Sequence, residues 1–365
     1  MSLNTIKIIL AALALPIFSA GNGNFATESK PLHAYLIAAK GQYIEIDPTT
    51  LQVIGQGNIW DNVTVQRPQW ATILSNKEIL DSHIDSSSNR LFILVGSAKA
   101  GLLNGYIVLR STTLKLEGII SQEMDLGPTT LIPNPNDKRI YVGYLSGGKG
   151  NDHGHTTTAI FNNETYMREG ELPGLALKSP SCLVQGTPLL YSDHNVIDTR
   201  SNTVSQKVRI GEGPFVPVQC QSNRVLAVLE SKAKTILPAV YDLKEGRVVG
   251  TIETDIPFRL NTGEWNLSPD GSTVIRDERE SATIGAGVEL RHTGRLTFFD
   301  VRTGAKLGHV QLANPSETSH ILGYSGDGKM LVYQVASAVS VIDIHRRVEV
   351  GQIDWPLDIK LVDWP

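Results

Sequence analysis

The stretch that decides the fold is TFFDVRTGAKLGHVQL, residues 297–312. An apolar run ends at Asp300, a polar turn containing Gly304 follows, and a second run alternates apolar and polar residues. Alternation with a period of two is the pattern of a half-buried β-strand, and Asp and Gly are residues that tight turns favour. The stretch therefore predicts two antiparallel strands joined by a short turn.

The same pattern occurs seven times along the chain of 365 residues. The residue that opens the turn in successive copies is Asp47, Arg110, Asn162, Asp198, Asp242, Asp300 and Asp343. These positions lie 36 to 63 residues apart, with an average of about 49, which is the repeat length of β-propeller blades. The repeats therefore predict a ring of blades rather than separate small domains.

A second pattern, a β-turn followed by an apolar strand, precedes most copies. It is clearest in LSPDGSTVI (267–275) and YSGDGKMLVY (324–333). Together the two patterns give four antiparallel strands per unit, so seven units predict an all-β, seven-bladed β-propeller over residues 33–365. The first unit lacks an innermost strand, and the apolar run Ile359–Asp363 has no unit after it. We therefore expect this run to join the N-terminal blade and close the ring.

The first residues are typical of an export signal. Lys7 is the only charge in residues 1–21, and the apolar run from Ile8 to Phe18 is too short to span a bilayer. Residues 22–32 would then be a linker, and the mature protein would be periplasmic or secreted and without a transmembrane segment. A buried first strand or an uncleaved anchor is the alternative interpretation. The formal net charge of −4 shows no basic excess, so no nucleic-acid partner is expected.

The two cysteines, Cys182 and Cys220, fall on equivalent strands of neighbouring units. Export would permit a disulfide between them, whereas two reduced and buried thiols fit the sequence equally well. The chain has no Cys-x-x-Cys pair. A structural zinc site and thioredoxin-like chemistry are therefore unsupported.

The repeat pattern resembles that of YVTN or surface-layer propellers over the whole predicted mature chain. Two parts resemble more closely the propeller subunit of quinoprotein amine dehydrogenases: HAYLIAAKGQYIEIDPTTLQVIG from His33, and WNLSPDGSTVIRDERESATIGAGVELRHTGRLTFFDVRTGAKLGHVQL from Trp265, which carries a long insertion. That resemblance implies a largely non-catalytic scaffold whose partner, a separate small subunit, carries the quinone. Nothing in this chain can be matched to the quinone residues. We therefore expect no cofactor in this chain, and a quinone or haem would belong to the partner.

Propellers generally bind ligands and partners on the face formed by the connections between blades and by the loops between second and third strands. In blade three such a loop, residues 147–155, carries a glycine-rich stretch with two histidines, and in blade six the insertion 276–294 is the longest. Segments 58–70, 255–265 and 314–320 are expected to be inter-blade loops. The expected face for a protein subunit or small ligand comprises Asp152, His153, His155, Arg276, Glu278, Arg291, His292, His320, Trp70 and Trp265.

The residue types on this face suggest several chemistries. Asp152, His153 and His155 could ligate a divalent metal with help from His292 or His320, although solvated, hydrogen-bonding histidines are the simpler interpretation. The charged insertion 276–294 could supply two carboxylates for acid–base catalysis, but we favour a solvated hairpin or a loop that docks a partner. Tryptophans near the inter-blade segments could anchor a partner, or could pack between blades. The sequence contains no G-x-S-x-G elbow.

These observations leave three hypotheses for function. The first is an exported binding or scaffold propeller, with enzymatic activity left open. The second is a stand-alone, metal-dependent, lactonase-like hydrolase that uses the mouth of the channel, with Asp152, His153, Glu278 and His292 as the residues to suspect. The third is a surface-layer or envelope protein that self-associates without ligand or activity.

Overall fold

A computed structural model describes residues 33–74, 77–85, 88–96, 105–120, 126–146, 156–172, 175, 177–192, 194–210, 215–221, 223–256, 263–284, 287–313, 319–335, 338–355 and 359–363. The predicted signal and linker, residues 1–32, lie outside the described residues.

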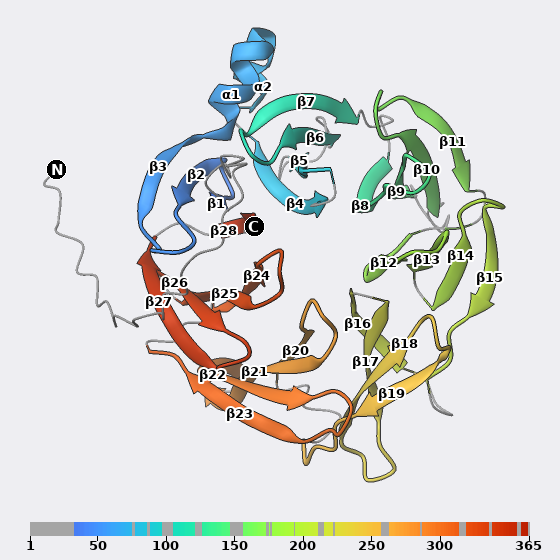
Figure 1. Cartoon of the computed structure of the whole chain (residues 1–365), viewed down its shortest axis with the longest axis vertical. Helices are drawn as coiled ribbons and strands as arrows, with labels where there is room; N and C mark the ends of the chain where they lie inside the picture. Colours follow the sequence, from blue (N-terminus) through green and yellow to red (C-terminus); the bar gives the residue numbers. More distant parts are fainter. Residues whose placement is uncertain are drawn as a thin grey trace, which may run out of the picture.

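Seven four-stranded antiparallel sheets surround a common axis, as Figure 1 shows. From the centre outward, the first sheet contains β28 (Ile359–Asp363), β1 (Ala34–Ala38), β2 (Gln42–Ile46) and β3 (Val53–Asn58). The second contains β4 (Glu78–Asp85), β5 (Arg90–Gly96), β6 (Gly105–Arg110) and β7 (Lys115–Ile120). The third contains β8 (Leu126–Asn134), β9 (Arg139–Ser146), β10 (Thr156–Asn162) and β11 (Arg168–Leu172).

The remaining four sheets follow the same order. The fourth contains β12 (Ser181–Val184), β13 (Leu189–Ser192), β14 (Asn195–Asp198) and β15 (Thr203–Lys207). The fifth contains β16 (Phe215–Gln221), β17 (Arg224–Glu230), β18 (Ile236–Asp242) and β19 (Arg247–Thr251). The sixth contains β20 (Gly263–Leu267), β21 (Thr273–Ile284), β22 (Gly287–Asp300) and β23 (Lys306–Gln311). The seventh contains β24 (His320–Tyr324), β25 (Met330–Val335), β26 (Ala338–Asp343) and β27 (Val348–Asp354). The predicted seven-bladed propeller is confirmed.

The ring closes as predicted, because β28 forms the innermost strand of the first blade. It pairs antiparallel with β1, with Tyr35 opposite Asp363 and Leu36 opposite Val362. Residues from the two ends of the propeller thus share one sheet (Figure 1). Closure in this way pairs the inner edge of β1 with the outer edge of β28, so that neither of these two edges is open to pairing with another chain.

The core lies in the seams between neighbouring blades. Between blades five and six, for example, Leu226 and Val240 of one blade pack with Trp265 and Val274 of the next. Between blades six and seven, Phe298 packs with buried residues on the strands of blade seven. Packing a side chain into such a seam joins residues far apart in the sequence. The content of each seam is therefore a tertiary property.

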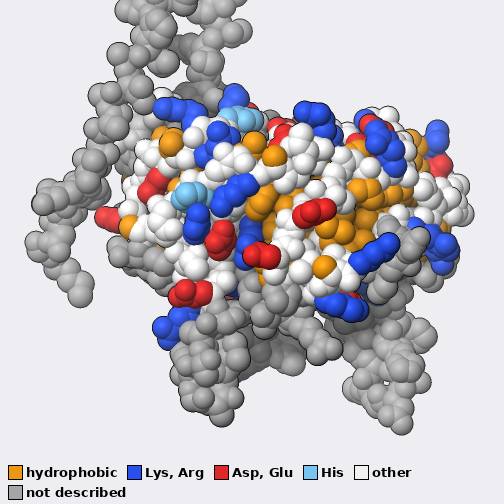
Figure 2. Space-filling view, turned by 90° about the horizontal axis from the view of Figure 1, so that it is seen from below, with side chains coloured by type: hydrophobic (Ala, Val, Ile, Leu, Met, Phe, Trp, Pro, Cys, Tyr) orange, Lys and Arg blue, Asp and Glu red, His pale blue; other side chains and the backbone are white. Residues whose placement is uncertain are grey.

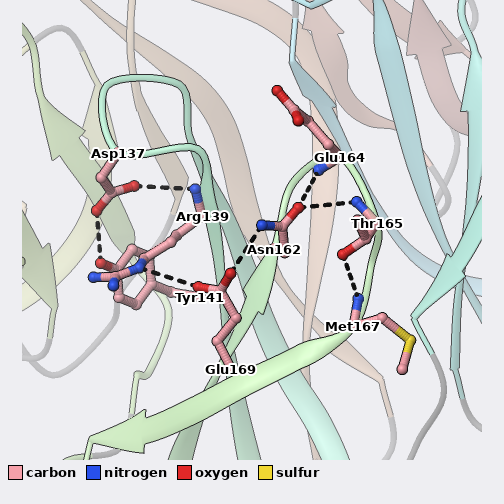
Figure 3. A network of polar contacts seen from close by, with 8 residues as sticks. All are labelled: Asp137, Arg139, Tyr141, Asn162, Glu164, Thr165, Met167 and Glu169. Carbon is pink, nitrogen blue, oxygen red and sulfur yellow. Dashed lines mark hydrogen bonds and ion pairs between the residues drawn. The ribbon is translucent and has the colours of Figure 1, made fainter.

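The residue that opens the turn in each repeat shows why Asp recurs there. In blade five, Asp242 Oδ1 accepts hydrogen bonds from the backbone N–H groups of Lys244 and Glu245, at 2.9 and 3.0 Å. In blade three, Asn162 plays the same part toward Glu164 and Thr165 (Figure 3). A short side-chain acceptor at this position satisfies backbone donors that the turn leaves unpaired.

The segment 58–70 is not the irregular loop we expected. It forms α1 (Ile59–Gln66) and a 3₁₀ turn, η1 (Pro68–Trp70), followed by α2 (Ala71–Leu74). Asn58 caps α1 by accepting a hydrogen bond from the Trp60 N–H at 2.9 Å, and Ile59, Trp60 and Val63 bury one side of the helix. Cap and apolar side together stabilise a helix that is too short to stand out in the sequence. No helix among the described residues is long and apolar enough to cross a membrane.

Candidate functional site

We call the end of the ring at which second strands pass into third strands the top face. The predicted glycine-rich loop of blade three belongs to this face, because β9 and β10 are the second and third strands of that blade. Asp152, His153 and His155 themselves lie outside the described residues, between Ser146 and Thr156. The metal site predicted for them stays a prediction.

The insertion of blade six is a long β-hairpin and not a loop. β21 and β22 pair from Thr273–Asp300 to Ile284–Gly287, with a bulge between Asp277 and Arg279. The neighbouring strand β20 pairs with β21 only as far as Glu278. Beyond that point the hairpin is a two-stranded ribbon that continues above the blade. The backbone ladder between the two strands supplies hydrogen-bond partners that a loop would have to find in water.

The base of this hairpin holds a buried polar cluster formed by Asp277, His292 and Tyr333. Asp277 is fully buried, and the Tyr333 hydroxyl lies 3.0 Å from each of its carboxylate oxygens. The Nδ1 atom of His292 lies 3.1 Å from Asp277 Oδ2, and the His292 side chain is only 5% exposed. Tyr333 comes from β25 of blade seven, so the cluster joins the hairpin to the next blade. The charged, solvated hairpin that we favoured is therefore wrong for its base.

Burial sets the electrostatics of the cluster. It raises the pKa of Asp277 to about 7, although the hydrogen bond from Tyr333 acts in the opposite direction. Burial also lowers the pKa of His292, and the charges of Arg279 and His320 lower it further. Burial thus favours the uncharged form of both groups, so the Asp277 carboxyl group keeps its proton to a higher pH than an exposed aspartate would.

An ion pair borders the cluster on the side of the central channel. Arg279 of β21 pairs with Glu264 of β20, the innermost strand of blade six. Both side chains are partly exposed, unlike Asp277 beneath them. Glu264 raises the pKa of Asp277, whereas Arg279 lowers it. The pair thus forms a solvent-facing border whose two charges act on the buried proton in opposite directions.

Successive side chains of β21 point to opposite faces of blade six. Asp277 faces blade seven, whereas Arg276 lies over the ring of Trp265, with its guanidinium carbon 5.5 Å from the ring centroid. Trp265 is 3% exposed and packs in the seam with blade five. The seam buries the indole, so packing between blades is the one of the two expected uses of this tryptophan that the structure shows. Glu278 accepts a hydrogen bond from the Thr297 hydroxyl and faces Arg295 at 3.9 Å.

The other predicted residues are spread around the top face. His320, the first residue of β24, is partly buried and near enough to influence His292. Arg291 is exposed on β22, whereas Trp70 on η1 packs partly against the core of blades one and two. Within the described ranges, no group of three or more His, Cys, Asp or Glu residues could hold a metal ion. The structure thus brings His292 and His320 together but shows no metal site around them.

Sequence reasoning missed Tyr333 in the cluster and Glu264 in the ion pair at its border. Tyr333 belongs to a predicted strand of blade seven and carries no local sign of a polar role. Glu264 precedes Trp265 at the start of an innermost strand, and the pairing of β20 with β21 places it beside Arg279. An acidic residue next to a bulge in a long hairpin is the one available signal for Asp277, and it does not predict burial.

Cys182 and Cys220 form a disulfide, with their Cα atoms 5.6 Å apart. They lie on β12 and β16, the innermost strands of blades four and five. The bond links two neighbouring blades directly. It decides between the two states of the cysteines that the sequence left open.

Comparison with known proteins shows likeness in fold only. No protein-family model matches the chain, and no curated protein matches it. Hydrazine synthase from Kuenenia stuttgartiensis is 16% identical, with 73% of this chain and 76% of that chain covered and a TM-score of 0.49. The dihydro-heme d1 dehydrogenase NirN is 11% identical, with 92% and 76% covered and a TM-score of 0.49. The β-propeller domain of Cps50 from Myceliophteria thermophila is 9% identical, with 78% and 90% covered and a TM-score of 0.49. The sheet topology itself establishes that this chain is a seven-bladed β-propeller.

Proposed function

We propose that the protein is an exported binding or scaffold propeller and that the β21–β22 hairpin docks a protein partner on the top face. The observation that supports this function is the shape of the hairpin. Its outer part, from Arg279 to Gly294, continues beyond the strands that flank it in blade six. A two-stranded ribbon with charges of both signs is suited to meeting a complementary protein surface.

The base of the hairpin supports a docking role because it is held firmly. Tyr333 of blade seven bonds to Asp277, and Thr293 donates a hydrogen bond to the backbone oxygen of Glu278 at 3.0 Å. A ribbon anchored in this way loses little conformational freedom when a partner binds. Pre-organisation of this kind raises affinity by reducing the entropic cost of association.

The resemblance to amine dehydrogenases suggests what kind of partner this is. It covers the blade-six insertion, so the docked partner would be a small subunit that carries a quinone. This chain would act as its scaffold and would have no dehydrogenase activity alone. Two features support export: the apolar segment near the N-terminus, and the disulfide between Cys182 and Cys220, a bond that persists mainly in oxidising compartments.

The experiment shortens the hairpin and leaves the blade intact. Glu280 and Arg291 face each other in the ladder, so an Asn-Gly turn can join them directly and replace residues 281–290. The full chain is purified gently from the exported fraction, and chains that co-purify in stoichiometric amount are identified by mass spectrometry. We expect the partner, with quinone absorption, to accompany the full chain but not the shortened chain. Lys306→Gln on the rim strand β23 serves as a control and should retain the partner.

Three outcomes would contradict the proposal. Equal retention of the partner by both forms would place docking outside the hairpin. A solitary protein with one tightly bound divalent ion would favour the hydrolase, and the double variant His153→Ala, His155→Ala would then test the ligands. An intact N-terminus together with free thiols in the native protein would exclude export.

A further inference from the structure

The outermost strand of every blade has one edge that is not paired within its sheet. Such edges are open to pairing with other chains, and proteins commonly protect them with charged residues or proline. Six of the seven outer strands carry charged residues: Lys115 and Glu117 in β7; Arg168, Glu169 and Glu171 in β11; Lys207 in β15; Arg247 in β19; Lys306 in β23; Glu349 and Asp354 in β27. Figure 2 accordingly shows basic and acidic side chains interspersed over one side of the ring.

β3 is the exception among these seven strands. Its sequence, VIGQGN, contains neither a charged residue nor proline. Val53 and Ile54 are 44% and 50% exposed, which is high for large apolar side chains. The strand lies on the outside of the ring beside β27 (Figure 1), and β27 exposes Val348 and Val350. The unprotected edge therefore lies beside further exposed apolar side chains.

The turn that precedes β3 also contacts β27. A Cβ atom added to Gly351 of β27 would lie 2.5 Å from Leu51 Cδ1, so the leucine rests directly on the glycine backbone. The carboxylate of Glu45, which reaches Gly55 of β3, is bound by His33 and by the Tyr35 hydroxyl on the same sheet. β3 itself is uncharged and partly apolar, whereas β27 beside it carries Glu349 and Asp354.

The ladder between β2 and β3 shows which backbone groups point outward. The N–H group of Ile59 donates to the oxygen of Gly41 at 2.9 Å. Hydrogen-bonded and non-hydrogen-bonded pairs alternate in an antiparallel ladder, so Tyr43 and Gly57 form the next bonded pair and Ile44 and Gln56 do not. The N–H and C=O groups of Gln56 therefore point away from β2, toward a neighbour outside the blade.

We propose that β3 is a dimerisation edge at which the β3 strand of a second copy of this chain pairs antiparallel. A strand without charges is matched best by another such strand, and β3 is the one outer strand described that has this property. Antiparallel pairing of a strand with its own copy has two-fold symmetry, so the same residues serve both chains. The apolar side chains of Val53 and Ile54 lose exposed surface in that pair. The dimer forms on the rim and does not depend on the docking proposed for the top face.

The first test removes the outward hydrogen-bond donor of β3. Gln56→Pro deletes that N–H group but leaves the ladder to β2 in place, because proline is tolerated where the N–H of an edge strand faces outward. His309→Pro on β23 is a matched control. The Leu312 N–H donates to the Gly294 oxygen, just as the Ile59 N–H donates to Gly41, so His309 lies three residues before the donor as Gln56 does. The backbone groups of His309 therefore also point away from the neighbouring strand. Light scattering over a concentration series should give the mass of two chains for wild type and for His309→Pro. Gln56→Pro should give the mass of one chain.

A second pair of variants keeps the proposal testable if proline disturbs folding. Ile54 is the extra residue at the bulge of β3, and Leu307 is the extra residue at the bulge of β23. Ile54→Lys adds a charge to the proposed edge, whereas Leu307→Lys adds the same charge to a strand that already carries one. We expect only Ile54→Lys to shift the equilibrium to single chains. Cooperative thermal unfolding of each variant verifies that it is folded.

Three results would overturn the proposal. Wild type could have the mass of one chain at every concentration. It could form a dimer whose mass neither Gln56→Pro nor Ile54→Lys changes, which would place the interface elsewhere. It could also retain a different polypeptide that both β3 variants release, which would show that the edge binds another protein and not its own copy.

Discussion

One hairpin of blade six contains two aspartates with opposite properties. Asp300 ends β22 beside a turn, and Thr303 donates to it both its backbone N–H and its hydroxyl, each at 2.7 Å. These hydrogen bonds hold the pKa of Asp300 below its ordinary value. Asp277, on the other strand of the same hairpin, is fully buried, and burial raises its pKa to about 7.

The difference lies in where each carboxylate finds its donors. The donors to Asp300 come from a residue three positions along the chain, so any blade with this turn provides them. The hydroxyl that binds Asp277 comes from Tyr333, 56 residues away in the next blade. The turn at Asp300 therefore favours the ionised carboxylate, whereas the seam at Asp277 favours a carboxyl group that keeps its proton. Four predictions test this contrast.

The largest effect is expected for Asp277→Ala. The substitution leaves the Tyr333 hydroxyl and the His292 ring buried without their partner, so the free energy of unfolding should fall by about 3 kcal/mol. Urea unfolding at neutral pH measures it. Asp277→Asn is the control, because the amide still offers an oxygen to Tyr333. A loss for Asp277→Asn as large as that for Asp277→Ala would mean that the charge, and not the hydrogen bond, stabilises the seam.

The second prediction concerns the pH dependence of stability. The raised pKa of Asp277 contributes stability below its unfolded pKa and loses it as pH rises to about 7. The lowered pKa of His292 contributes stability above its unfolded pKa, near 6.5, and loses it as pH falls. Immediately below pH 6.5 the two slopes therefore oppose each other, and the stability of the wild type should depend less on pH there than it would with either group alone.

Single variants should reveal the two slopes. With His292→Gln, stability should fall as pH rises from about 4 to 7, by at most about 1.4 kcal/mol per pH unit. With Asp277→Asn, it should instead rise with pH up to about 6.5. Urea unfolding in a series of buffers gives both profiles, each compared with wild type. Slopes of the same sign in the two variants would contradict the opposite pKa shifts of Asp277 and His292.

The third prediction tests the link between blades six and seven. Tyr333→Phe removes one hydrogen bond to a buried carboxyl group and keeps the ring, so we expect a loss of about 1.5 kcal/mol. Because that hydrogen bond lowers the pKa of Asp277, its removal should raise this pKa further. A titration followed by NMR of the carboxyl carbon measures the shift. An unchanged pKa would argue against the contact.

The smallest effect is expected at the turn. Asp300→Ala removes the acceptor for the Thr303 backbone and should cost about 1 kcal/mol, while Asp300→Asn should cost less, because Asn162 serves the same turn in blade three. The lowered pKa of Asp300 means that its charge contributes stability above an unfolded pKa of about 4 and loses it as pH falls. At acidic pH, urea unfolding should therefore give the same free energy of unfolding for wild type and for Asp300→Asn. A gap between them that persists in acid would contradict this account.

The sequence by itself determined the elements that depend on local chemistry. The seven turns, the four strands per blade and the pairing of Ile359–Asp363 with the first blade all follow from periodicity and from turn residues such as Asp300 and Gly304. These signals act over a few residues, and the ring follows because seven similar units must pack side by side. The helix at Ile59–Gln66 was missed because its two turns give too short a period to recognise.

The tertiary structure alone decided what each seam contains. It buried Asp277, which the sequence placed in the charged insertion, and Trp265, which the sequence placed at the end of an inter-blade segment. It joined Cys182 to Cys220. It also brought Tyr333 and His320 of blade seven toward His292 of blade six. The physical reason is that neighbours in a seam lie on different blades, tens of residues apart. A side chain's burial there depends on how two sheets pack, and no local pattern records that.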